Sequence, residues 1–211
     1  MSVRTVLISC AGLNSRFGLN MPRCLAPVEG KPVIQWQLDH LQDFEDLIVV
    51  VGCQAPEIMR TVLEKRPDAV FAVNHDPQKA NLLEAMAMGV NFLREPFLYL
   101  DGNALVSSTA IQAMADAPCP SIGIRRTYSE NPVGVRLGTG NHEGEVIGFT
   151  LEPQEYEWIG LAKLDPQHIK GAPGVECVYQ VIERFLPIAA VKVSSAESFP
   201  VPQAEDMRAT G

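Results

Sequence analysis

Two arginines lie in a loop rich in glycine, asparagine and proline near the start of the chain. The apolar run Thr5–Cys10 has the pattern of a buried strand, and Arg16 and Arg23 stand in the loop Ala11–Gly30 that follows it. A strand that ends in such a loop is a common phosphate site, because backbone N–H groups converge on the anion and glycine admits it closely. Guanidinium groups match phosphate oxygens as planar forks. The alternative interpretation is a polar connection in which both arginines are solvated.

The loop matches neither of the two best-known phosphate-binding patterns. The Walker pattern G-x-x-x-x-G-K-[ST] is absent, and so is the dinucleotide pattern G-x-G-x-x-G. The elements that position the loop therefore matter for its interpretation.

Strand and helix patterns alternate through the first half of the chain. The continuous β-branched run Leu47–Val51 is typical of a strand covered on both faces. Strands are predicted at Thr5–Cys10, Leu47–Val51, Ala69–Val73 and Pro96–Leu100, and helices at Pro32–Leu41, Pro56–Glu64 and Leu82–Leu93. This rhythm indicates a parallel sheet with crossover helices. We expect a ligand site at the carboxyl ends of the strands that begin at Thr5, Leu47 and Pro96.

The second half of the chain has a less regular pattern. Strands are predicted at Ser121–Arg125, Gly134–Leu137, Val146–Leu151, Glu157–Leu164 and Ile188–Val193, and a helix at Val175–Phe185. The segment GTGNHEGE is typical of a hairpin loop, and the polar tail from Gln203 predicts a short helix. No repeat, low-complexity block or linker interrupts the chain. We therefore expect one α/β domain over residues 1–211, with a Rossmann-like mixed, mostly parallel sheet flanked by helices.

Composition and charge exclude several classes of function. The 211 residues carry a formal net charge of −8, which excludes a general nucleic-acid coat, because phosphate backbones need a basic face. No stretch reaches about 20 apolar residues, so no membrane span is expected. The 5 cysteines lack CxxC spacing and the 4 histidines share no ligand spacing. These patterns indicate the reduced thiols of a cytoplasmic protein rather than a disulfide framework or a zinc site.

The ordered set of motifs resembles the sugar-phosphate and choline-phosphate nucleotidyltransferases. That family has a strand, a G-x-G-[ST]-R loop, a P-K-x-L motif, and G-K-P before a helix. The matching segments here are Gly12-Leu13-Asn14-Ser15-Arg16, Pro22-Arg23-Cys24-Leu25 and Gly30-Lys31-Pro32. Downstream, Asn74–Gly89 resembles the helix under the nucleotide, Asp101-Gly102-Asn103 the metal site, and Tyr156–Leu164 the acceptor-side strand. Each motif is weak alone, but their order along the chain is specific.

The resemblance implies a reaction in which an acceptor phosphate attacks the α-phosphorus of a nucleoside triphosphate and pyrophosphate leaves. The short branch that acts on choline phosphate or phosphonates, often with CTP, is the most similar. Arg16 would bind the leaving β- and γ-phosphates, and Arg23 would contact the reacting phosphates. The resemblance further implies nucleotide contacts at Ala11, Gly12, Asn14, Ser15 and Asn81, Mg²⁺ at Asp101 and Asn103, and acceptor contacts at Glu157, Trp158 and Gly160.

Four positions depart from the family pattern. Asn14 replaces the second loop glycine, and asparagine tolerates a positive φ better than most residues. Arg23 replaces a lysine, which exchanges a point charge for a fork. Asn103 and Pro202 stand where two metal-binding aspartates are expected, and neither carries a negative charge. Asp101 could substitute for a missing aspartate only if it faces the same side as Asn103, as residues two apart on a strand do.

Three functions remain open on the sequence. The first is an active nucleotidyltransferase, the second a catalytically impaired nucleotide-binding relative that acts through a partner, and the third a GT-A-type glycosyltransferase. The third class uses a D-x-D metal pair, whose second aspartate is missing here. Trp158 is expected either to stack on the acceptor or to pack in the core, and Glu157 either to meet a cationic acceptor or to be solvated. The sequence leaves homo-oligomerisation open.

Overall fold

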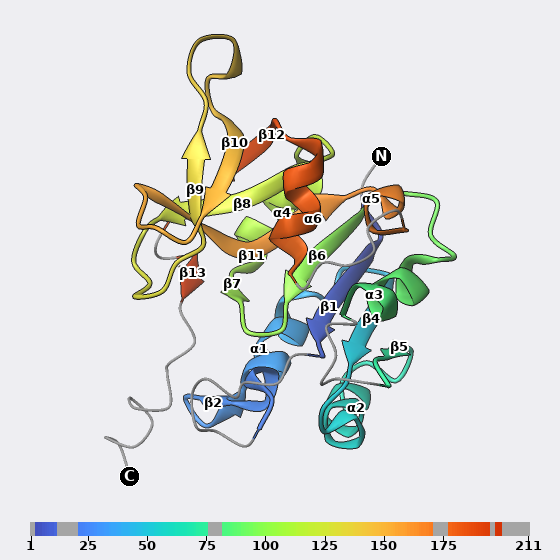
Figure 1. The fold of residues 1–211 in the computed structure, drawn as a ribbon. Coiled ribbons are helices and arrows are strands. Elements are labelled where there is room, and N and C mark those ends of the chain that lie inside the picture. The colour runs from blue at the N-terminus through green and yellow to red at the C-terminus, as the bar shows by residue number, and fades with distance from the viewer. Residues whose placement is uncertain (1–2, 12–20, 76–81, 171–176, 195–196, 200–211) are drawn as a thin grey trace.

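A single mixed sheet organises the computed structural model, which describes residues 3–11, 21–75, 82–170, 177–194 and 197–199. Its nine strands follow the order β5-β4-β1-β6-β11-β8-β12-β10-β9 (Figure 1). The strands of the sheet are β1 (Thr5–Cys10), β4 (Asp46–Val51), β5 (Val70–Val73), β6 (Phe97–Asp101), β8 (Ser121–Arg126), β9 (Gly134–Leu137), β10 (Glu145–Thr150), β11 (Tyr156–Leu164) and β12 (Ile188–Lys192). Two small ribbons pair β2 (Pro27–Val28) with β3 (Lys31–Pro32), and β7 (Leu105–Val106) with β13 (Ser198–Phe199).

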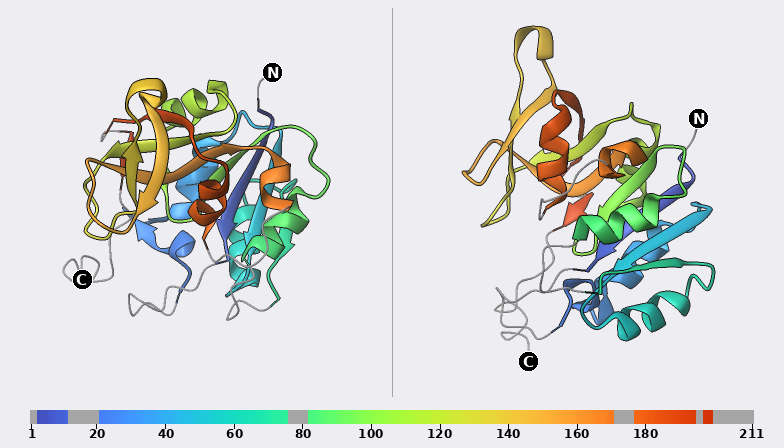
Figure 2. Two further views of the ribbon diagram at one scale, coloured as in Figure 1. Left: turned by 45° about the horizontal axis from the view of Figure 1, so that its top comes forward. Right: turned by 45° about the vertical axis from the view of Figure 1, so that its right-hand side comes forward.

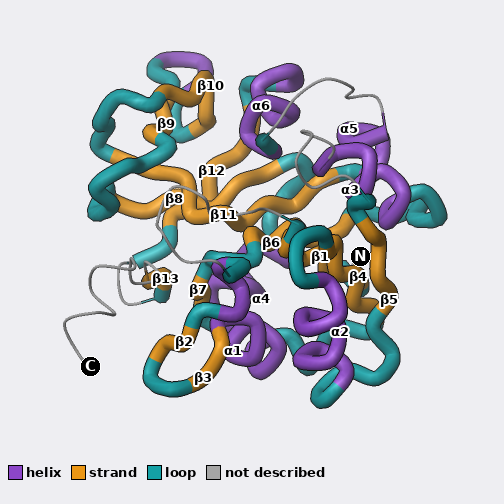
Figure 3. Tube along the Cα trace, turned by 60° about the horizontal axis from the view of Figure 1, so that its bottom comes forward, coloured by secondary structure: helices purple, strands orange, loops and turns teal. Residues whose placement is uncertain are grey.

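Helices cover both faces of the sheet (Figure 3). They are α1 (Val33–His40), α2 (Ala55–Leu63), α3 (Leu82–Val90), α4 (Ser108–Asp116), α5 (Pro166–Lys170) and α6 (Val178–Ile182), with 3-10 turns at η2 (Arg23–Leu25), η3 (Gly140–His142) and η4 (Glu183–Phe185). Side chains of β1 alternate between the two faces, as a strand requires. Val6 and Ile8 join the core beneath α1, α2 and α4, whereas Leu7 joins the core beneath α3, α5 and α6.

The sheet changes direction where β11 enters it. Strands β5, β4, β1 and β6 pair in parallel. Strand β11 then lies between β6 and β8 and is antiparallel to both, and β12 pairs in parallel with β8. The mixed α/β sheet expected from the sequence is confirmed, and its continuous parallel part is narrower than expected. The carboxyl ends of β1, β4 and β6 share one edge of the sheet, as predicted.

The predicted strands are all present, and none of their predicted ends differs from the observed end by more than one residue. Helix α4 was not predicted, although its signals are in the sequence. Ser107 accepts a hydrogen bond from the backbone N–H of Ala110 at 3.1 Å, which is an N-cap, and Ile111 and Met114 provide the buried face. The helix predicted over Val175–Phe185 is found as α6 and η4 within the described residues. The predicted helix from Gln203 lies outside them.

The predicted hairpin joins β9 to β10 and projects from the body of the protein (Figure 2). Its loop contains η3, and a hydrogen bond between Nδ1 of His142 and Oε2 of Glu145 at 2.7 Å lies beside the turn. Among the helices that the structure describes, none has both the length and the apolar character required to cross a membrane.

Candidate functional site

The carboxyl ends of β1, β4 and β6 meet in close contact. Ala11 directly follows β1 and Gly52 directly follows β4, and a Cβ atom on Gly52 would lie 2.9 Å from the carbonyl oxygen of Ala11. Gly102 directly follows β6, and its backbone N–H donates to the carbonyl oxygen of Ser9 at 2.9 Å. A Cβ atom on Gly102 would lie 2.5 Å from the same oxygen, so a larger residue cannot enter without moving the backbone.

Asp101 ends β6 at this edge and has an unusual electrostatic environment. Burial raises the pKa of the Asp101 carboxyl to about 6, because removal from water disfavours its charged form. The hydroxyl of Tyr99 donates a hydrogen bond to Oδ1 of Asp101, and the positive charge of Arg23 lies nearby; both oppose the rise. Burial also raises the pKa of Tyr99 well above its usual value, and the Asp101 charge adds to that effect. The Tyr99 hydroxyl is therefore a persistent donor to Asp101.

Arg23 lies in η2, where the chain returns to the described structure after residues 12–20. Burial lowers the pKa of its guanidinium, and the Asp101 carboxylate opposes that change. The structure therefore brings a cation from the loop within electrostatic reach of the acidic end of β6. The predicted contact of Arg23 with reacting phosphates remains a prediction.

Gly160 of β11 packs directly against Asp101. Its φ is +76°, and a Cβ atom there would lie 2.8 Å from both Cβ and Oδ2 of Asp101. The register between β11 and β8 shifts between Trp158 and Ala162, which is a bulge that re-aims the strand at this point. The motif predicted on the acceptor side and the motif predicted at the metal thus touch in the structure.

Trp158 belongs to an aromatic cluster beside Asp101. Its ring stacks on Tyr99 with 6.2 Å between centroids, and it meets Phe149 and Tyr179 edge-on at 6.3 and 6.4 Å. The indole N–H donates to the carbonyl oxygen of Leu161 at 3.3 Å. Trp158 is half-buried, so its packing role is clear in the structure. Its predicted contact with an acceptor remains a prediction.

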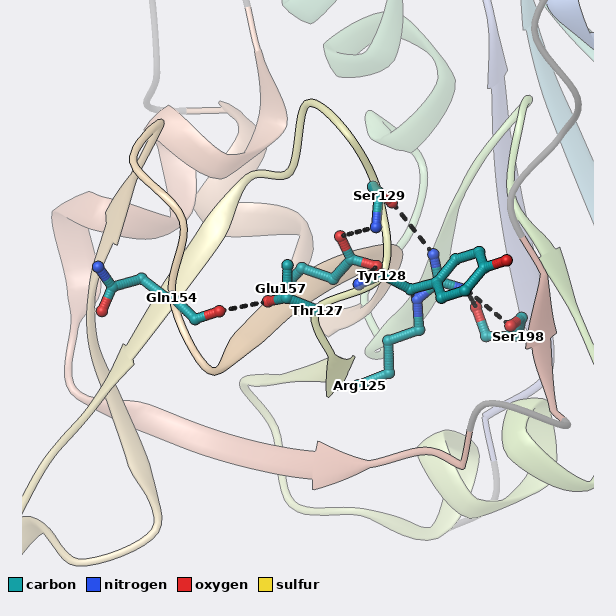
Figure 4. Close-up of polar contacts among 7 residues, drawn as sticks. All are labelled: Arg125, Thr127, Tyr128, Ser129, Gln154, Glu157 and Ser198. Carbon is teal, nitrogen blue, oxygen red and sulfur yellow. Dashed lines mark hydrogen bonds and ion pairs between the residues drawn. The ribbon is translucent and has the colours of Figure 1, made fainter.

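Glu157 forms a buried ion pair, which neither interpretation of the sequence anticipated (Figure 4). Its Oε1 accepts from Nε of Arg125 at 2.6 Å, and its Oε2 accepts from the backbone N–H of Ser129 at 3.2 Å. Arg125 also donates to the carbonyl oxygen of Ser198 in β13 at 2.7 Å. Only 1% of Glu157 is exposed, so its carboxylate is neither solvated nor open to a ligand. The pair ties β8, β11, the loop after β8 and β13 together.

Breaking this pair is expected to cost about 3 to 5 kcal/mol of stability, because a buried charge is left without its partner. The variant is Arg125→Met, measured by urea unfolding. The matched control is Arg126→Met, whose ion pair with Glu155 at 3.5 Å is exposed. That control is expected to change stability by about 0.5 kcal/mol or less. Equal losses in the two variants would contradict the structural role of the buried pair.

Several predicted site residues lie outside the described part of the chain. They are Gly12, Asn14, Ser15, Arg16, Asn81 and Pro202. The structure also identifies Tyr99 as a neighbour of Asp101 that the sequence motifs did not include. A signal for Tyr99 existed, because it stands two residues before Asp101 on one strand and shares its face.

The expected Mg²⁺ can be tested against the oxygen atoms at this edge. Oδ2 of Asp101 faces the backbone of Gly160, at the position where a Cβ atom would crowd it. Among the described residues, the hydrogen bond from Tyr99 goes to Oδ1, and none is made to Oδ2. The same residues contain no group of three or more histidine, cysteine, aspartate or glutamate side chains that could hold a metal. Magnesium commonly takes one or two carboxylates and completes its shell with substrate phosphates and water. Asp101 provides one such carboxylate, which fits an ion that arrives bound to a nucleotide. Asn103 lies in the turn after β6 and not on the strand, so the shared strand face expected for it is corrected, and its contact with the ion remains a prediction.

Comparison with known proteins gives a consistent picture. The family model of the "MobA-like NTP transferase domain" matches residues 6–125. A CMP-5'-(3-aminopropyl)phosphonate synthase from Streptomyces rubellomurinus is 29% identical over 124 residues, which is 55% of this chain and 19% of that protein. The bifunctional protein GlmU from Cupriavidus necator is 29% identical over 148 residues, which is 67% of this chain and 32% of that protein. The chain thus matches less than two thirds of the length of these relatives.

Solved structures share the fold over nearly the whole chain. The inositol-1-phosphate CTP transferase from T. maritima has a TM-score of 0.77 at 12% identity, covering 98% of this chain and 92% of that one. The CTP:phosphocholine cytidylyltransferase from Streptococcus pneumoniae has a TM-score of 0.75 at 16% identity, covering 100% and 98%. At these identities the likeness establishes the architecture of the chain, while its substrates need separate arguments.

Proposed function

Because the chain belongs to the MobA-like NTP transferase family, we propose that it transfers a nucleoside monophosphate from an NTP to a phosphorylated or phosphonate small molecule. An acceptor oxygen forms a bond to the α-phosphorus, the bond from that phosphorus to the bridging oxygen breaks, and pyrophosphate leaves. The observation that carries the proposal is the contact between Asp101, at the end of β6, and Gly160 of β11. Through this contact, the segment that resembles the acceptor-side strand meets the segment that resembles the metal site, at the carboxylate of Asp101.

CTP is the nucleotide that we favour. By its name, the phosphonate synthase above makes a conjugate of CMP with a phosphonate, and two of the similar structures are named as CTP transferases for inositol 1-phosphate and phosphocholine. These names pair a cytidine nucleotide with a small phosphate or phosphonate. Other relatives differ in the base, since a UDP-glucose pyrophosphorylase shares the fold as well. The test below therefore includes all common NTPs.

Positioning and charge stabilisation would supply most of the rate, because phosphoryl transfer requires little covalent chemistry from the protein. Arg16 would hold the leaving phosphates and Arg23 would offset charge near Asp101. Gly12 and the N–H groups of its loop, with Asn81, would line the nucleotide. Bound Mg²⁺ would reduce the negative charge that builds on the transferred group. Trp158 and Gly160 would form the acceptor wall.

We further propose that residues 1–211 act as one domain. Strand β11, from the second half of the chain, pairs with β6 from the first half and carries β8 on its other side. A substrate bound at the shared edge would therefore contact both halves of the chain at once.

The direct test measures pyrophosphate release with each common NTP and with choline phosphate, a phosphonate and sugar 1-phosphates as acceptors. We expect slow turnover, with CTP preferred, because Asn103 and Pro202 provide no charge at the metal. Asn103→Asp combined with Pro202→Asp should raise turnover about tenfold or more by fixing the ion in place. Asn131→Asp adds one charge at an exposed position as a control. The proposed activity would be rejected if neither the unmodified protein nor the Asn103→Asp, Pro202→Asp double variant released pyrophosphate with any pair of NTP and acceptor.

A second candidate function is nucleotide binding without fast turnover. It is favoured by the described residues, which contain no group of three or more histidine, cysteine, aspartate or glutamate side chains that could hold a metal. In that case the NTP would stabilise the protein in thermal unfolding by about 2.7 kcal/mol at 100 times its Kd, while neither protein releases pyrophosphate. A glycosyltransferase is disfavoured by the family match and by the missing second aspartate of the D-x-D pair.

A further inference from the structure

Gln37 is a buried amide that touches the turn after β6. It lies on α1 and is 2% exposed. Its Nε2 donates to the carbonyl oxygen of Asp101 at 2.8 Å and to the carbonyl oxygen of Ala104 at 2.7 Å. Within the turn, the backbone N–H of Ala104 donates to the carbonyl oxygen of Asp101 at 2.9 Å. The side-chain amide of Gln37 thus donates one hydrogen bond to each end of the turn 101–104, which contains Asp101 and Asn103.

The arrangement leaves one polar atom of Gln37 without compensation. Oε1 is buried and has no hydrogen-bond partner in the described structure. An orphaned buried acceptor costs about 1 to 3 kcal/mol, so an apolar side chain of the same length would be the simpler choice for folding alone. The two donated hydrogen bonds are the feature that an apolar residue cannot reproduce. They hold together two carbonyl oxygens that would otherwise repel each other.

Helix α1 connects this turn to the nucleotide segment. The helix directly follows β3, and the backbone N–H of Val33 donates to the carbonyl oxygen of Ala26, next to η2. η2 carries Arg23, whose charge acts on Asp101. One rigid unit therefore contains the end of the nucleotide loop, the helix and, through Gln37, the backbone of the turn. Helices position such groups more accurately than loops do.

We propose that Gln37 is a positioning residue, which fixes the turn 101–104 relative to the end of the nucleotide loop. The proposal rests on the proposed function, since the turn is where the nucleotide-bound metal would be held. Gln37 contacts the backbone alone and takes no part in the bond changes. Its effect on the reaction comes through the placement of Asp101 and Asn103, and small displacements of such groups lower rates strongly.

The test compares Gln37→Met with Gln35→Met. The two glutamines lie on the same helix, but Gln35 is partly exposed, and its amide donates to Glu64 at 3.4 Å, on the surface and away from the turn. Methionine keeps the length of the side chain and removes the donors. Hydrogen exchange of the Gly102 and Ala104 amides reports on the turn, with the β4 amides as an internal reference. We expect exchange at the turn to rise about tenfold or more in Gln37→Met and to stay unchanged in Gln35→Met.

The functional arm measures CTP binding with and without Mg²⁺ by calorimetry, together with pyrophosphate release. In Gln37→Met we expect the gain in affinity from Mg²⁺ to shrink, and kcat to fall about tenfold, with the KM for CTP within twofold. Unchanged exchange at the turn would overturn the proposal, and so would raised exchange with an unchanged Mg²⁺ gain. If the unmodified protein binds CTP without turnover, the proposed activity fails, while exchange and the Mg²⁺ gain still decide the role of Gln37.

Discussion

Replacing Asp101 by asparagine is expected to remove turnover and, at neutral pH, to stabilise the metal-free protein. The carboxylate lies at the junction of β6 and β11, against Gly160. Its loss should lower kcat at least about 100-fold, as removal of a charge-stabilising group does in other enzymes. Asparagine still accepts the hydrogen bond from Tyr99, and it avoids the burial of a charge. The gain in stability is expected to be about 1 to 3 kcal/mol at pH 7.5.

The pH dependence of this gain has a definite sign. The pKa of Asp101 is about 6 in the folded protein and near 3.8 when the chain is unfolded. Below about pH 4 the carboxyl is neutral in both states, so the wild-type protein loses nothing to the asparagine variant. Between about pH 4 and 6 folding must take up a proton on Asp101, so the wild-type protein loses stability relative to the variant as pH rises. Above about pH 6 the charge is buried on folding, and the full difference remains. Thermal unfolding in EDTA at pH 4, 5, 6 and 7.5 measures the difference.

Asp116→Asn is the matched control, because it makes the same substitution at an exposed carboxylate at the end of α4. A rise of about 2 to 12 °C in Tm at pH 7.5 would correspond to the expected gain for a chain of this size. An Asp101→Asn variant that is less stable than wild type at pH 7.5 would show that the carboxylate is well compensated in the apo state. A gain that persists undiminished at pH 4 would assign the effect to packing instead of charge.

Gly160→Ala is expected to have the second large effect, on stability and turnover together. The φ of +76° alone costs an alanine about 1 to 2 kcal/mol. The added methyl group would also lie 2.8 Å from Cβ and Oδ2 of Asp101, and overpacking of this kind costs about 1 to 3 kcal/mol more. Because the methyl group displaces Asp101 itself, turnover should fall about 100-fold.

The control for the backbone contribution is Gly144→Ala in the projecting hairpin. Gly144 has a φ of +82°, but a Cβ atom there has nothing within 4 Å. Subtracting its loss of stability from that of Gly160→Ala isolates the contact with Asp101. Urea unfolding and pyrophosphate release would be measured for both variants. If the two alanines destabilise the protein equally and both retain activity, β11 does not constrain Asp101 as the structure indicates.

Local patterns were sufficient for most elements, because β-branched runs and helix starts act over a few residues. Leu47–Val51 predicts β4 from its own composition, and the same holds for Thr5–Cys10 and β1. The position of β11 could not be predicted in this way. Its antiparallel insertion between β6 and β8 depends on contacts between residues far apart in the sequence. Helix α4 was missed despite the capping serine at Ser107.

The site shows the same division between local and distant information. Asp101 and Gly160 were both selected from motifs, but only the fold shows that they touch. The burial of Glu157 depends on Arg125, which is 32 residues away and gave no sign of pairing in the sequence. Gln37 is a polar residue on an otherwise ordinary amphipathic helix, and its partners are 64 and 67 residues away. Such contacts arise from topology, so a single sequence contains no local signal for them.

Because β11 is inserted between β6 and β8, the segment that matches the family model is not a complete folding unit. Similarity to the family model ends at residue 125, inside β8, yet the hydrogen-bonding neighbour of both β6 and β8 is supplied by residues 156–164. A fragment cut at that boundary would expose two unpaired strand edges in its middle, where another chain could add itself. The recognisable part of this protein is therefore not a module that can be moved between proteins by itself. Recombination within this fold would have to exchange β11 together with the strands on either side of it.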